Sequence, residues 1–111
     1  MKLTSKPQGN INIVTVEEAR IDAAGAIQFK DAIREVTENG LDEVILDLSH
    51  VQFIDSSGLG AIVAVMKILT PERTLALACL TKDVSKVFTL TRMDRIFKIH
   101  DQLPDQARKA G

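Results

Sequence analysis

The chain has 111 residues, 45% of them hydrophobic and 26% charged, and its formal net charge at pH 7 is −1. A chain of this length is expected to form one domain, residues 1–111, that buries a hydrophobic core without disulfides. Acidic and basic residues are interspersed, and the basic stripe that binds nucleic-acid phosphates is missing, which argues against direct nucleic-acid binding.

The chain begins with two short alternating segments, residues 1–6 and 11–16, separated by the turn residues Pro7-Gln8-Gly9-Asn10. This arrangement predicts an antiparallel hairpin. The N-terminus has no apolar signal segment, and no run of 18 apolar residues follows. We therefore expect a cytoplasmic protein with no membrane partner.

An amphipathic helix is predicted after Asp22, ending at Asn39-Gly40. A strand follows at residues 43–48, and then a second helix that ends before Thr70-Pro71. The second helix is apolar on two sides, of which one is a core stripe and the other consists of Ala61, Ala64, Val65 and Ile68. Either another helix of the domain or a partner protein is expected to cover that second side, and the sequence leaves the choice open.

A strand at residues 74–80 contains the single cysteine, Cys79, which is expected to be a small buried hydrophobic residue and not a reactive thiol. Thr81 is expected to cap a third helix, and a short strand at residues 97–99 precedes a tail helix from Pro104. The order is β-β-α-β-α-β-α-β-α. With crossover helices, this order predicts an α/β fold with a four- or five-stranded mixed sheet and helices mainly on one face.

Two serines lie between the strand at residues 43–48 and the second helix, in the segment Asp55-Ser56-Ser57-Gly58. A helix N-terminus has unpaired N–H groups and the positive end of the helix dipole, so it favours an anionic group. This segment is therefore a candidate for binding or carrying phosphate.

The longer string Val51-x-Phe53-Ile54-Asp55-Ser56-Ser57-Gly58-Leu59-Gly60 resembles the signature of STAS domains, in the anti-sigma factor antagonist branch. The opening hairpin, Ile21-Asp22 before the first helix and Val84-x-x-Val87-Phe88 agree with the same family, so the resemblance covers most of the chain. The family commonly has a glycine shortly before the Ile-Asp pair, where this chain has Ala19 and Arg20.

The resemblance implies a single STAS domain that is not an enzyme and that needs no cofactor and no metal. It implies that the unphosphorylated form binds an anti-sigma factor serine kinase and thereby releases a sigma factor. It implies further that phosphorylation of Ser56 ends this binding and that a PP2C-like serine phosphatase reverses the modification. The alternative within the family is a non-switching scaffold or a soluble subunit of a membrane transport assembly.

The residues expected to contact the partner surround the serine: Asp22, Asp55, Ser57, Gly58, Leu59, Gly60, Ala61 and Ala64. Most of them have an expected structural role as well. Ser57 is expected to cap the second helix, and Asp22 caps the first helix, faces the serine, or both. Asp55 ends the strand or binds N–H groups of the loop. Gly58 and Gly60 either leave room for another backbone or a nucleotide to approach or allow close packing of helix on sheet, and close packing is the expected need of Gly60.

Other functions fit the sequence less well. A serine hydrolase needs a histidine beside the serine, and nothing places His50 or His100 at the loop. A receiver domain phosphorylated on Asp47 needs an acidic pair for Mg²⁺, for which Glu17-Glu18 is the candidate. The opening hairpin and the lack of a clear lysine at the end of a later strand argue against it. No group of His, Cys and carboxylate residues has the spacing of a metal site.

Overall fold

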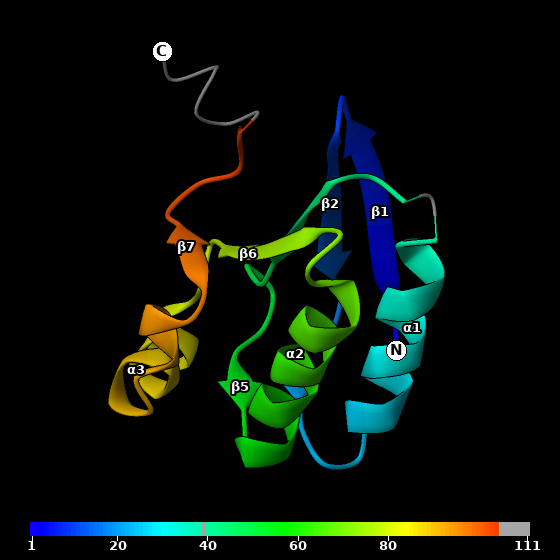
Figure 1. Ribbon diagram of the computed structural model, residues 1–111. Helices are drawn as coiled ribbons and strands as arrows, with labels where there is room; N and C mark the ends of the chain where they lie inside the picture. The colour runs from blue at the N-terminus through cyan, green and yellow to red at the C-terminus, as the bar shows by residue number, and fades with distance from the viewer. Residues whose placement is uncertain (39, 105–111) are drawn as a thin grey trace.

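The computed structural model describes residues 1–38 and 40–104, which form a mixed sheet with helices packed against it (Figure 1). The sheet has five strands in the order β1-β2-β4-β6-β7. Strands β1 and β2 pair antiparallel, and all other pairs in this sheet are parallel. The bounds are β1 Leu3–Gln8, β2 Ile11–Val16, β4 Glu43–Asp47, β6 Thr74–Ala78 and β7 Lys98–His100. The predicted α/β fold with a mixed sheet is confirmed.

A second, smaller sheet was not predicted. It consists of β3 (Arg20–Ile21) and β5 (Phe53–Ile54), which pair in parallel. Two residues per strand are too few to produce a recognisable alternation of apolar and polar side chains. This β3–β5 ribbon lies directly before the segment that carries the two serines.

The described residues include three α-helices, α1 (Ala26–Val36), α2 (Ser56–Leu69) and α3 (Lys82–Leu90), followed by the short 3-10 helix η1 (Met93–Arg95). Buried residues of all three α-helices join one hydrophobic cluster with the sheet, including Phe29, Ile62 and Phe88. Within the described residues, no helix has the length and hydropathy needed to cross a membrane.

Helix α1 packs against α2, and part of the second apolar side of α2 is buried in the main hydrophobic cluster. Ala61 and Val65 are buried on that side, at 4% and 1% exposure. Ala64 is half-buried, and Ile68 stays 42% exposed. Part of this side is thus covered within the domain, which leaves Ala64 and Ile68 as a narrow strip of α2 at the surface.

A smaller cluster lies on the opposite face of the sheet, where Ile45, Ala76 and Ala78 are buried. Cys79 is half-buried at the edge of this cluster. Burial raises the pKa of the Cys79 thiol, and the negative charge of Asp47 raises it further. A raised pKa keeps the thiol protonated, which agrees with the expectation of an unreactive cysteine.

Several predicted element ends differ from the structure. Helix α1 ends at Val36 with Thr37 as its C-cap, before the predicted Asn39-Gly40, and the Thr37 hydroxyl donates to the Ile33 carbonyl at 2.7 Å. Thr81 does precede α3, but its hydroxyl donates to the Val51 carbonyl at 2.7 Å and not to the helix. The tail helix predicted to begin at Pro104 falls on residues 105–111, which are outside the described part of the chain.

Candidate functional site

The β3–β5 ribbon brings two distant parts of the sequence to the start of α2. Arg20 pairs in register with Phe53, and Ile21 with Ile54. Ile21 and Ile54 are buried in the core, whereas Arg20 and Phe53 are exposed. Because alternate residues of a strand point to opposite faces, the ribbon has one apolar face on the core and one face at the surface. Ser56, the first residue of α2, follows two residues after Ile54.

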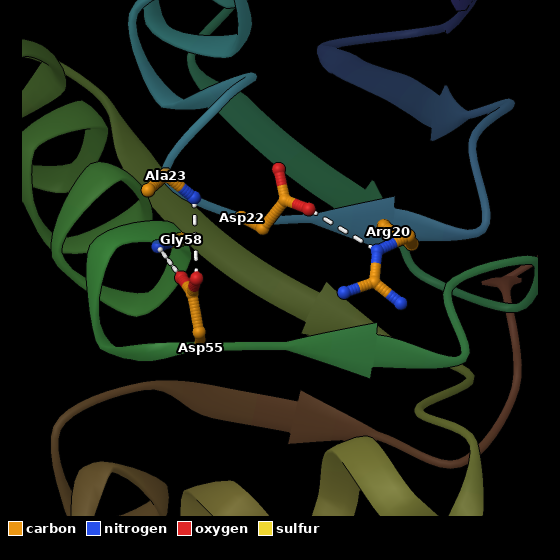
Figure 2. Close-up of polar contacts among 5 residues, drawn as sticks. All are labelled: Arg20, Asp22, Ala23, Asp55 and Gly58. Carbon is orange, nitrogen blue, oxygen red and sulfur yellow. Dashed lines mark hydrogen bonds and ion pairs between the residues drawn. The ribbon is translucent and has the colours of Figure 1, made fainter.

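Asp55 is the N-cap of α2, and its carboxylate hydrogen-bonds both to α2 and to the loop that follows β3 (Figure 2). One oxygen, Oδ1, accepts a hydrogen bond from the Gly58 N–H at 2.9 Å. The other, Oδ2, accepts from the Ala23 N–H at 3.2 Å. The prediction that Ser57 caps this helix is therefore wrong. The alternative expectation for Asp55, that it binds N–H groups of the loop, is confirmed.

The same hydrogen bonds keep Asp55 ionised. The Gly58 N–H makes the largest contribution to lowering the pKa of Asp55 below its ordinary value, 3.8. Desolvation opposes this effect, while the N–H groups of Ala23 and Ser57 and the positive charge of Arg20 add to it. Asp55 therefore carries a negative charge beside Ser56 at neutral pH.

Both serines of the motif are exposed and lie in the first turn of α2. The hydroxyl of an exposed serine at this place is open to modification by another protein. The unpaired N–H groups of the first helical turn favour a negative group at such a position, while the adjacent Asp55 carboxylate repels one. A phosphate here would add charge to the surface and displace no core residue.

The two glycines of the motif have different surroundings. A Cβ on Gly58 would overlap the backbone carbonyl of Ile21, and it would meet the Ile54 side chain at 3.0 Å. A Cβ on Gly60 would have no neighbour within 4 Å. Gly58, which is buried, therefore allows the close packing of α2 on the ribbon. Close packing, one of the two roles expected of Gly58, is thus confirmed, whereas the prediction that Gly60 serves this packing is wrong.

Asp22 lies beside Asp55 but does not cap α1. The N-cap of α1 is Gly25, which makes no side-chain cap. The Asp22 carboxylate instead pairs with Arg20, with 3.1 Å between Oδ2 and Nε (Figure 2). Asp22 directly precedes Ala23, whose N–H binds the Asp55 carboxylate, so Asp22 and Asp55 both lie near the start of α2. Of the expected contact residues on α2, Ser57 and Gly60 are exposed and Ala64 is half-buried, whereas Leu59 and Ala61 are buried.

Arg20 and Phe53 belong to the site, although the sequence did not single them out. The guanidinium carbon Cζ of Arg20 lies 4.1 Å from the centre of the Phe53 ring. A pocket of about 400 Å³ opens beside Arg20 and Asp22, and it is also lined by Met1, Glu18 and Gln28. The only signal in the sequence was the presence of Arg20 before the Ile-Asp pair, close to where the resembled family has a glycine.

The residues that the rival functions require lie in other environments. His50 pairs with Glu17, with 3.4 Å between Nε2 and Oε1. His100 is half-buried in β7. Asp47, the candidate phosphoacceptor of a receiver domain, is buried at the end of β4 and accepts hydrogen bonds from the Thr15 hydroxyl and the Ser49 N–H. Asp47 therefore has a structural role at the sheet.

Comparison with known proteins agrees with this geometry. A profile of the STAS domain family matches residues 2–106. A curated relative from Thermotoga maritima, named "Putative anti-sigma factor antagonist", is 36% identical over 95 residues, which are 84% of each chain. A crystal structure of a protein of that name from the same organism has a TM-score of 0.79 at 27% identity, over 96% of this chain and 92% of the other. An anti-sigma factor antagonist from Mycobacterium paratuberculosis shares the fold, with a TM-score of 0.81 at 24% identity over 98% and 92% of the two chains.

Proposed function

Since the chain belongs to the STAS domain family, in its anti-sigma factor antagonist branch, we propose that it is a phosphorylation-controlled antagonist with Ser56 as its phosphoacceptor. Its unphosphorylated form binds an anti-sigma factor that is a serine kinase, and this binding releases the sigma factor. Phosphorylation of Ser56 ends the binding. A serine phosphatase of the PP2C type returns the protein to its binding form.

The observation that carries this proposal is the place of Ser56. It is exposed, it begins α2, and it follows an ionised aspartate whose hydrogen bonds fix the loop. A kinase can therefore reach the hydroxyl without unfolding the domain. Because the serine lies at the surface, the phosphate changes the contact surface and leaves the core intact.

Phosphorylation of Ser56 is expected to change the charge of the contact surface strongly. A phosphoserine carries about −1.5 to −2 charges at pH 7 and three strong acceptor oxygens. Beside Asp55 and Asp22 it would make a local group of three anions. Any partner that packs closely on Ser56 would then have to desolvate this charge, which disfavours the complex.

The proposed contact surface consists of the exposed parts of the motif. On α2, this surface includes Ser57, Gly60 and Ala64. It also includes Asp22 and Asp55, which directly follow the two strands of the ribbon. Gly58, Leu59 and Ala61 support this surface from below, because their positions are buried. The protein would act in the cytoplasm as a regulator and not as an enzyme.

The test is the modification state of the protein isolated from its own cells. Intact mass and fragment mapping, before and after treatment with a phosphoserine phosphatase, should find one phosphate, on Ser56. A chain that stays unmodified under several growth conditions would contradict the switch. That result would favour the alternative of a non-switching scaffold or a subunit of a transport assembly.

A further inference from the structure

Four side chains lie on the β3–β5 ribbon or directly after its two strands. Arg20 and Asp22 come from one segment, and Phe53 and Asp55 from the other. The ribbon therefore presents one cation, two carboxylates and one aromatic ring directly before Ser56. Figure 2 shows the Arg20 guanidinium and the carboxylates of Asp22 and Asp55 along this ribbon.

Two contacts hold the Arg20 side chain in place. Because this side chain is exposed, it can easily exchange them for others. Its Nε donates to the Asp22 carboxylate at 3.1 Å, and its guanidinium lies over the Phe53 ring. The Arg20 side chain is 60% exposed. Surface ion pairs contribute little to stability, so this pair is easily given up. Of the five N–H donors of this arginine, only Nε–H hydrogen-bonds to a residue in the described part of the chain.

The charge of Arg20 already acts at the start of α2, since it helps to lower the pKa of Asp55. Ser56 follows Asp55 and is three residues beyond Phe53, the register partner of Arg20. At about 3.3 Å per extended residue, Ser56 lies at most ~10 Å beyond Phe53, and Arg20 lies on the neighbouring strand, about 4.8 Å to the side. An arginine and a phosphoserine, both with extended side chains, bridge such a distance.

From this arrangement we infer that Arg20 is the intramolecular receiver of the phosphate on Ser56, and that it leaves Asp22 and the Phe53 ring to bind it. The inference rests on the proposed function, in which Ser56 is phosphorylated. A guanidinium binds phosphate through two parallel N–H···O bonds, and a dianion attracts it more strongly than a single carboxylate does. Arg20 then exchanges two weak contacts, with Asp22 and with the Phe53 ring, for one stronger contact.

This exchange extends the effect of the phosphate beyond the serine. When the guanidinium moves, the Asp22 carboxylate loses its cation and the exposed Phe53 ring loses its cover. A partner that recognised the unmodified ribbon therefore meets a changed charge pattern at two strands as well as a new phosphate. Arg20 acts here as a positioning residue and takes no part in phosphoryl transfer.

The experiment uses the full chain with phosphoserine installed at position 56 during synthesis, so that no kinase is needed. A ³¹P NMR titration gives the second pKa of the phosphate, which is about 6 for an ordinary phosphoserine. We expect Arg20→Gln to raise this value by about half a unit or more relative to the parent chain. The matched control is Arg34→Gln, which removes an exposed arginine from the last turn of α1. That substitution should leave the value unchanged.

A second measurement follows the arginine itself. The Nε–H resonance of Arg20 should shift on phosphorylation of Ser56, and Asp22→Asn, which removes the competing carboxylate, should lower the phosphate pKa further. Equal phosphate pKa values in the parent chain and in the Arg20→Gln variant would overturn the inference. That outcome leaves the proposed function standing, because the function is tested by phosphate found on Ser56 in cells.

Discussion

The backbone carbonyl of Ile21 occupies the space that a side chain on Gly58 would need. Helix α2 therefore approaches the ribbon more closely at this point than any residue with a Cβ would allow. The first turn of α2, with both serines of the motif, is placed by this contact together with the two hydrogen bonds to Asp55. The position of Ser56 depends on packing that lies just below it.

Gly58→Ala is expected to lower the free energy of unfolding by about 2–3 kcal/mol, because the backbone of β3 or α2 must shift to admit the methyl group. The matched control is Gly60→Ala, in the same helix turn, where a Cβ meets nothing within 4 Å. It should raise the stability by about 0.5–1 kcal/mol through helix propensity. Chemical denaturation of the two variants measures both values, and equal effects would contradict the assignment of close packing to Gly58.

Asp55→Ala is expected to lower the melting temperature at pH 7, because the N–H groups of Gly58 and Ala23 lose their acceptor. Ser57→Ala should change stability by less than about 0.5 kcal/mol, since Ser57 is exposed and is not the cap. Thermal unfolding of the three proteins decides the matter. A larger loss from Ser57→Ala than from Asp55→Ala would restore Ser57 as the cap.

The contribution of Asp55 to stability should depend on pH. The pKa of Asp55 is lower in the folded protein than the ordinary value of 3.8. Its ionised form is thus favoured by folding, so its stabilisation is fully present above that value and is lost as the pH falls through the lower, folded value. The difference in melting temperature between the parent chain and Asp55→Ala should stay constant from pH 7 to about pH 5 and shrink below pH 3.8. A difference that persists undiminished at pH 2 would contradict this account.

Ser56→Asp should retain the fold and weaken binding to the partner kinase by at least about tenfold, which corresponds to ~1.4 kcal/mol. Ser56→Ala should bind the kinase, and ATP should not release it. Ser85→Ala, at an exposed serine of α3 outside the proposed contact surface, is the matched control, which should bind and be released as the parent chain is. Binding to the purified kinase, measured with and without ATP, tests all three, and undiminished binding of Ser56→Asp would argue against the switch.

Ala64→Glu and Ala61→Glu separate the surface of α2 from its buried side. Ala64 is half-buried, so a glutamate can extend into solvent; we expect the fold to persist and partner binding to weaken. Ala61 is 4% exposed and packs in the core cluster, so a glutamate there would bury a charge and unfold the domain. Circular dichroism and the binding assay distinguish the two results. A folded Ala64→Glu variant with unchanged affinity would remove this strip of α2 from the proposed surface.

The sequence predicted the larger features because long, regular patterns carry them. The apolar runs at residues 43–48 and 74–80 and the periodic spacing of Phe29 and Ile33 gave strands and helices within a few residues of their observed bounds. The motif also placed Ser56 at the start of a helix. These features depend on neighbours in the sequence, which the sequence displays directly.

The details of the site could not be predicted, because they depend on contacts between distant segments. Whether Asp55 or Ser57 caps α2 is decided by Ala23, which offers Asp55 a second donor from a loop 32 residues away. Whether Gly58 or Gly60 is required is decided by Ile21. The pairing of Arg20 with Phe53 requires the register of two-residue strands. None of these partners is visible in the local pattern.

The contact between Asp55 and Ala23 also determines what a modifying enzyme would have to recognise. A peptide of a dozen residues around Ser56 would lack Ala23 and Ile21, and a helix of that length is marginal in water. On the proposed function, the substrate of the kinase is therefore the folded domain and not a linear sequence. Substitutions remote from Ser56 that unfold the protein would abolish its phosphorylation as well. Phosphate on Ser56 would then indicate that the domain is folded as well as modified.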